Sequence, residues 1–79
     1  MGSLEFEEIK KIIELQFGRL EVKASDRFAE DLAAESADVI NLVAAVEDRF
    51  GITLKESEIA RLSTPQDLFE LVQARLRES

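Results

Sequence analysis

The amino-acid sequence predicts an all-α fold in which three longer helices and one short helix form a bundle. Apolar residues recur at helical spacing in three segments of the chain. Gly18 and Gly51 follow the first two segments and Thr64-Pro65 precedes the third, as is typical of helix ends and starts. A chain of 79 residues can bury one small core, so we expect a single domain over residues 1–79. Met1-Gly2-Ser3 fit either a native start or a remnant of cloning.

The first helix is expected from Leu4 to about Phe17, ending near Gly18. Ile9, Ile12 and Ile13 share one face because residues three and four apart are neighbours on a helix. Acidic residues precede lysines along this segment, which is the order that the helix dipole favours.

Residues 19–35 are expected to form a long loop between the first and second helices. Its expected apolar anchors are Leu20, Val22, Phe28 and Leu32. A loop of this length in a compact domain is usually functional or held by its own side chains. We expect Phe28 and Leu32 to pin it to the core.

The second helix is expected from about Ser36 to Arg49, with Gly51 ending it. With about 100° between successive residues, its apolar residues fall into two groups. The larger group is the expected core face: Val39, Leu42, Val43, Val46 and Phe50. The smaller group and its polar neighbours are Ala37, Asp38, Ile40, Asn41, Ala44, Glu47 and Asp48. This second surface is either buried in the bundle or a docking face for basic partners.

Residues 52–54 are expected to be an extended loop that buries Ile52 and Leu54, because so short a strand has nothing to pair with. Residues 56–62 can form only a short helix, with Ile59 and Leu62 pointing inward. We expect this short helix to be the most mobile element.

The last helix is predicted by its start. Thr64 is the expected N-cap, Pro65 the first helical residue and Asp67 the capping acid. The expected core face consists of Leu68, Phe69, Leu71, Val72 and Leu76.

The composition excludes several classes of function. The chain has no cysteine and no histidine, which removes disulfides, thiolate nucleophiles and Ser-His pairs, so we do not expect an enzyme. A net charge of −7 without Trp or Tyr disfavours nucleic acid and anionic membranes, and favours protein partners with basic patches. No apolar run reaches the roughly 20 residues of a membrane span. We expect a cytoplasmic monomer without membrane insertion.

Acidic clusters do not predict a metal site. The acids of residues 5–8 and Glu30-Asp31 lack the ligand spacing and the glycine of a calcium-binding loop. A solvated surface explains them better.

Ser36 is the candidate functional residue because it lies where the second helix begins. A hydroxyl there can accept hydrogen bonds from free backbone N–H groups, and an attached anion would lie at the positive end of the helix dipole. Ser36 is therefore either an ordinary N-cap or the site of an anionic group.

Around the serine the chain has an ordered series of residues: Phe28, Glu30-Asp31-Leu32, Ser36 and Asp38. This order resembles that of the acyl carrier protein family. The resemblance continues through residues 41–52 and 63–68 and covers nearly the whole chain.

This resemblance implies that a phosphopantetheinyl transferase attaches 4′-phosphopantetheine from coenzyme A to Ser36, which Glu35 and Asp38 flank. The thiol of that group would carry acyl intermediates as thioesters, and the chain itself would not be an enzyme. Acyl-handling enzymes with basic patches would dock on a surface of the second helix. We call this surface the docking face: Ala37, Ile40, Asn41, Ala44, Glu47 and Asp48.

Several residues depart from the usual pattern of the family. Glu35 replaces Asp, Ala37 replaces Leu, and Ala33 stands where Gly is common. Asn41 and Ala44 stand where an acid and a larger apolar residue are usual. These departures imply a carrier for a specialised fatty-acid, lipid or polyketide pathway.

Three alternatives stay open at this point. One is an unmodified, degenerate carrier fold that docks to another protein as an adaptor or subunit. The second is a peptidyl or aminoacyl carrier. The third is a small bundle that binds a metal ion or a lipid in a pocket of its own.

We predict that Ala37→Leu speeds modification by a general-purpose phosphopantetheinyl transferase. A buried leucine side chain contributes roughly 1–2 kcal/mol more than alanine, which corresponds to a rate increase of about fivefold or more. The measurement is the initial rate of modification of both forms. Equal rates would show that residue 37 does not contact the transferase.

Overall fold

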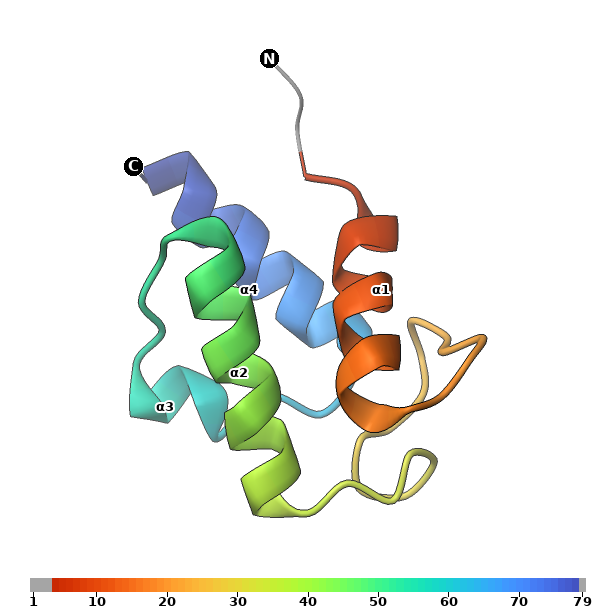
Figure 1. Ribbon diagram of the computed structural model, residues 1–79. Coiled ribbons are helices and arrows are strands. Elements are labelled where there is room, and N and C mark those ends of the chain that lie inside the picture. Colours follow the sequence, from red (N-terminus) through yellow and green to blue (C-terminus); the bar gives the residue numbers. More distant parts are fainter. Residues whose placement is uncertain (1–3, 79) are drawn as a thin grey trace.

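The computed structural model describes residues 4–78, and over that range it has four α-helices and no strand. The helices are α1 (Phe6–Phe17), α2 (Ser36–Phe50), α3 (Glu56–Ile59) and α4 (Pro65–Glu78). Helix α1 packs against both α2 and α4. Figure 1 shows α1 and α2 running in opposite directions, with the short α3 beside the first half of α2. The predicted all-α fold of three longer helices and one short helix is confirmed; Met1-Gly2-Ser3 lie outside the described residues.

The core contains side chains from every long helix and from the loops. The two isoleucines of α1, Ile9 and Ile13, are fully buried. The other buried apolar residues are Val22, Phe28, Leu32, Leu42, Val43, Val46, Leu54, Leu68 and Val72. Val39 and Phe50, the ends of the predicted core face of α2, are half-buried. The helical spacing of the sequence therefore identified the inward faces correctly.

Both predicted glycine stops are present. Gly18 and Gly51 adopt left-handed backbone conformations, with φ of +63° and +66°. The Gly51 N–H donates to the carbonyl of Glu47 at 2.8 Å, which closes the last turn of α2. Helix α1 begins at Phe6, two residues later than predicted.

The predicted start of α4 is also confirmed. The Asp67 N–H donates to the Thr64 hydroxyl at 3.2 Å, and the Asp67 carboxylate accepts from the Thr64 N–H at 3.2 Å. Pro65 takes the first helical position, where the N–H that it lacks is not needed. This reciprocal capping fixes the direction in which α4 leaves the loop before it.

The long loop between α1 and α2 is held on both sides. The Val22 N–H donates to the Glu14 carboxylate of α1 at 3.0 Å, and the Phe28 N–H donates to the Ser63 carbonyl at 2.8 Å. The Phe28 ring packs edge-to-face on Phe17, with 6.1 Å between ring centroids. These contacts tie the loop to α1 and to the segment before α4.

Of the four predicted loop anchors, three are confirmed and the prediction for Leu20 is wrong. This residue is 86% exposed, whereas Val22, Phe28 and Leu32 are buried. The chain takes left-handed conformations at Gly18 and at Glu21, so Val22 is the residue that reaches the core.

The segment between α2 and α3 is anchored at Leu54, two residues before α3 begins. Leu54 is buried, as predicted, and its N–H donates to the Glu47 carboxylate at 2.7 Å. Helix α3 spans four residues, and the chain continues as a turn at Ala60 and Arg61 rather than as helix. Ile59 and Leu62 are half-buried and pack against the core.

Ala33 lies in the left-handed region with φ of +53°, which explains why glycine is common at this position of the family pattern. A Cβ in this conformation costs roughly 1–2 kcal/mol. The loop contacts on both sides of Ala33 hold it there, three residues before α2 begins.

We predict that Ala33→Gly stabilises the protein by about 0.5–1 kcal/mol, because relief of the left-handed strain outweighs the ~0.4–1 kcal/mol entropy cost of glycine in the unfolded chain. The measurement is the free energy of unfolding in urea. Ala74→Gly, in the exposed interior of α4, is the matched control and should destabilise by about 1 kcal/mol. Destabilisation by both substitutions would contradict the strain at Ala33.

Candidate functional site

The site is built at the start of α2. Glu35 is the N-cap, with extended φ and ψ of −95° and 170°. Its N–H donates to the Asp38 carboxylate at 2.8 Å, which satisfies a donor at the helix start. The interpretation of Ser36 as the N-cap is therefore wrong by one residue: Ser36 is the first residue of the helix proper.

This capping leaves the hydroxyl of Ser36 available. Ser36 is exposed, and no hydrogen bond within residues 4–78 engages its side chain. It lies at the positive end of a helix of 15 residues, where a negative group is stabilised by about 0.3–1 kcal/mol. A phosphate ester at this oxygen would thus meet a favourable field.

A charged turn precedes the site in the loop. The Arg27 guanidinium pairs with Glu30 at 2.9 Å and with Asp31 at 3.2 Å. The pKa of Asp31 is lowered, mainly by the hydrogen bond from the Arg27 backbone N–H and then by the Arg27 guanidinium. The charged Asp31 therefore stabilises the turn at pH values above the ordinary carboxyl pKa. That contribution is lost as pH falls through the lowered value, and it is small because these side chains are well exposed.

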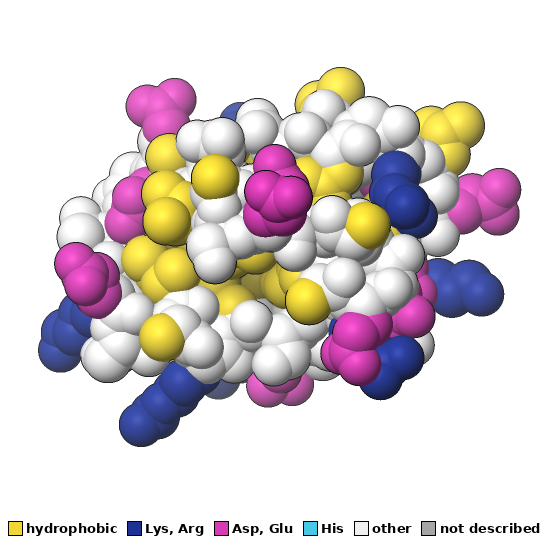
Figure 2. All heavy atoms as spheres, turned by 90° about the horizontal axis from the view of Figure 1, so that it is seen from below, with side chains coloured by type: hydrophobic (Ala, Val, Ile, Leu, Met, Phe, Trp, Pro, Cys, Tyr) yellow, Lys and Arg dark blue, Asp and Glu magenta, His cyan; other side chains and the backbone are white. Residues whose placement is uncertain are grey.

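A hollow of about 810 Å³ begins at Ser36. Its walls come from the loop, the first turns of α2, α3 and the segment that follows α3. The lining residues are Arg27, Phe28, Ala29, Glu30, Ala34, Glu35, Ser36, Val39, Ile40, Glu56, Ile59, Ala60, Leu62 and Ser63. Figure 2 looks onto the end of the molecule where α2 begins and shows hydrophobic side chains gathered in a depression, with acidic side chains around it.

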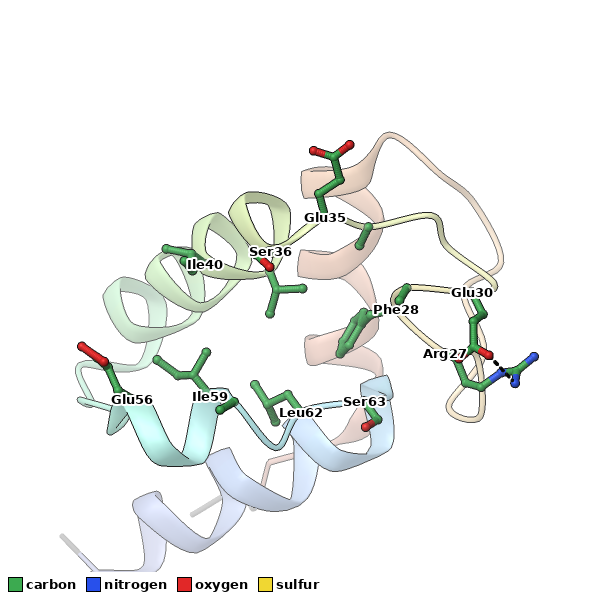
Figure 3. A pocket seen from close by; sticks show the side chains of 14 residues that line it. Arg27, Phe28, Glu30, Glu35, Ser36, Ile40, Glu56, Ile59, Leu62 and Ser63 are labelled. Atoms are coloured by element: carbon green, nitrogen blue, oxygen red, sulfur yellow. Dashed lines mark hydrogen bonds and ion pairs between the residues drawn. The ribbon is translucent and has the colours of Figure 1, made fainter.

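The interior of the hollow is apolar and its polar groups lie at the edges. In Figure 3 Ile59 and Leu62 point across the hollow toward α2, and Phe28 closes its loop side. Ser36 and Glu56 lie at the rim. Ile59 and Leu62 were expected to point inward because of their apolar spacing in the sequence, and they do. That spacing gave no sign that a space remains between α3 and α2 for them to line.

The docking face is mostly open to solvent. Ala37, Asn41, Ala44 and Asp48 are exposed, and Ile40 is 58% exposed although it is a large apolar residue. The sixth residue of this surface, Glu47, is half-buried, and its carboxylate is engaged by the backbone N–H of Leu54. The sequence left open whether this surface is buried in the bundle or open to partners. Burial is wrong for every residue of the docking face except Glu47.

The described part of the chain has neither a cluster of metal ligands nor a helix that could span a membrane. Residues 4–78 contain no group of three or more His, Cys, Asp or Glu side chains placed to hold a metal ion. None of the helices described is long and apolar enough to cross a membrane.

The fold and the site together define a class of protein: a small helical carrier bundle that presents a serine hydroxyl at a helix N-terminus, next to an apolar hollow. The comparisons with known proteins agree with this class. The family model described as "Phosphopantetheine attachment site" matches residues 7–72.

Curated relatives and solved structures that resemble this chain are named acyl carrier proteins. The acyl carrier protein of Helicobacter hepaticus is 37% identical over 71 residues, covering 87% of this chain and 93% of that protein. That of Wolinella succinogenes is 34% identical over 70 residues, covering 86% and 92%. The crystal structure of the acyl carrier protein from Thermotoga maritima matches with a TM-score of 0.79 and 32% identity, over 91% of this chain and 86% of that one.

A second structural match concerns the fold alone. The actinorhodin holo acyl carrier protein of Streptomyces coelicolor has a TM-score of 0.78 at 21% identity, covering 99% and 96% of the two chains.

The chain belongs to the acyl carrier protein family. Members of this family are carriers and not catalysts, and their phosphopantetheine-binding domain bears a covalently attached 4′-phosphopantetheine. They interact with phosphopantetheinyl transferases and with acyl-handling enzymes.

Proposed function

We propose that Ser36 is the attachment residue and that the hollow beside it receives an apolar acyl chain of a specialised fatty-acid, lipid or polyketide pathway. The observation that carries this proposal is the position of one exposed hydroxyl, on the first residue of α2 and at the rim of the hollow. When bound, the 4′-phosphopantetheine group supplies a thiol that holds acyl groups as thioesters.

The residues around Ser36 have separable roles in this proposal. The hydroxyl oxygen attacks the pantetheine-side phosphorus of coenzyme A; the new phosphodiester bond forms, the diphosphate linkage breaks, and the adenosine 3′,5′-bisphosphate leaves. A separate transferase performs this reaction, and this chain has no histidine to act as the usual general base. The N-terminal end of α2 stabilises the negative phosphodiester. Asp38 holds the N–H of Glu35 and so keeps the first turn formed while the serine stays exposed.

The docking face meets the partner enzymes. Ile40 offers exposed apolar area next to Ser36, and Asp48 with the overall charge of −7 attracts basic surfaces. Glu47 contributes less, since its carboxylate already holds Leu54. A monomer in the cytoplasm, expected from the sequence, stays a prediction within this proposal.

The apolar lining of the hollow supports apolar cargo. Each methylene buried there contributes about 0.8 kcal/mol, so a longer saturated chain gains most from Val39, Ile59 and Leu62. The departures at Glu35 and Ala37 support a dedicated rather than a general pathway. The same departures are the reason to keep the unmodified adaptor as the second candidate.

We predict that incubation with coenzyme A and a phosphopantetheinyl transferase adds one phosphopantetheine to the intact mass of the protein. Ser36→Ala should abolish this addition completely. Ser25→Ala, which removes another exposed serine in the preceding loop, is the matched control and should be modified like the unchanged protein. Modification of the Ser36→Ala variant would contradict the assignment, and resistance of the unchanged protein to several transferases would favour the adaptor.

We predict that an octanoyl chain on the attached group enters the hollow, whereas an acetyl group does not reach its interior. The measurement is the difference between the amide NMR spectra of the two loaded forms. The largest shifts should fall on Val39, Ile59 and Leu62, while the exposed Leu15 and Leu20 serve as unshifted controls. Shifts confined to the residues next to Ser36 would show that the chain stays in solvent.

A further inference from the structure

One wall of the hollow is weakly built. Helix α3 has only four residues, none of them fully buried, and so short a helix has little stability of its own. Its two sides face different surroundings: Ile59 lines the hollow, whereas Glu58 lines a separate depression between α3 and α4. Figure 3 shows α3 opposite the first turns of α2, so the width of the hollow depends on where α3 lies.

A partly buried ion pair joins this wall to α4. The Glu58 carboxylate accepts hydrogen bonds from the Lys55 backbone N–H at 2.9 Å and from the Arg75 guanidinium. The two side chains of the pair are only 26% and 18% exposed. Arg75 also contacts Glu78 at 3.0 Å, but that carboxylate is 64% exposed. Glu58 therefore caps α3 and fastens it to α4 through the same group.

The Arg75–Glu58 pair is well placed to resist movement of α3. Leu54 before α3 and Leu68 after it are buried, so the segment between them is fixed at both ends. Displacement of α3 away from α2 must move Glu58 relative to Arg75. Such a partly buried pair is less screened by salt than a pair on the open surface. The Lys55 N–H and then Arg75 lower the pKa of Glu58, which agrees with a carboxylate held in its charged form.

We propose that the Arg75–Glu58 pair is a latch on α3 that controls how long an acyl chain stays sheltered in the hollow. This inference rests on the proposed function, because it takes the hollow as the place of the chain. With the latch closed, α3 stays in place as a wall of the hollow, so the acyl chain keeps its apolar contacts and the thioester stays close to the protein. With the latch released, α3 moves outward more often and the chain and its thioester reach solvent.

The test uses Glu58→Gln, which keeps an oxygen to accept from the Lys55 N–H but removes the charge that pairs with Arg75. We expect about fivefold faster hydrogen exchange at the amides of Ile59 and Leu62 in the unmodified variant. We also expect hydroxylamine to cleave the octanoyl thioester of the loaded variant faster by a similar factor. In that reaction a nitrogen–carbon bond forms at the acyl carbon, and the thiol leaves.

The matched control is Glu78→Gln. It removes a second carboxylate that contacts the same arginine, with the same change of charge, but leaves Glu58 in place. It should change neither rate. A second variant, Arg75→Gln, should reproduce the effect of Glu58→Gln. The two substitutions together should add little to either alone, because each of them already breaks the Arg75–Glu58 pair.

An acetyl thioester should be cleaved at the same rate in all these variants, since so short a chain is not sheltered. Equal effects of Glu58→Gln and Glu78→Gln would overturn the latch, and so would faster amide exchange without faster cleavage of the octanoyl thioester. Failure of the unchanged protein to accept the group at Ser36 would instead count against the proposed function. Exchange in the unmodified variants would then still decide whether the pair holds α3.

Discussion

The burial of Phe28 is the constraint on which the arrangement of the site depends. Phe28 as a whole is 3% exposed and its ring packs on Phe17 of α1, while its N–H donates to the carbonyl of Ser63. Its own carbonyl accepts from the N–H of Ala34, two residues before α2 begins. One residue thereby connects α1, the start of α2 and the segment between α3 and α4, and it also closes one side of the hollow. Loss of this anchor would release Ser36 and the hollow together.

Near the site, acidic side chains hydrogen-bond to the backbone, whereas the hydroxyl of Ser36 stays available for modification. Asp38 takes the N–H of Glu35, and Glu47 takes the N–H of Leu54, so both acids fix the backbone. Ser36, between the helix start and the hollow, has no such task within the described residues. A carrier needs this division: rigid surroundings for the attachment residue, and no internal partner that competes with the transferase for its oxygen.

Much of the fold could be predicted from the sequence, because helix periodicity, glycine stops and the Thr64-Pro65 start are local signals. Leu20 was misplaced because the left-handed turn at Glu21, a non-glycine residue, has no clear signature in a single sequence. The sequence suggested Ser36 as the cap of α2, but in the structure Glu35 is the N-cap and its N–H donates to the carboxylate of Asp38. The hollow and the contact of Glu58 with Arg75 depend on how α3 lies against distant elements, which spacing along the chain does not specify.

The central claim is that the Ser36 hydroxyl carries the phosphopantetheine arm of this acyl carrier protein family member. The most direct measurement is peptide fragmentation mass spectrometry of the protein purified from its native host. The account predicts a phosphopantetheine, free or acylated, on the peptide that contains Ser36, with the bond located at that residue. An unmodified Ser36 in every molecule, or the group found on another residue, would contradict it.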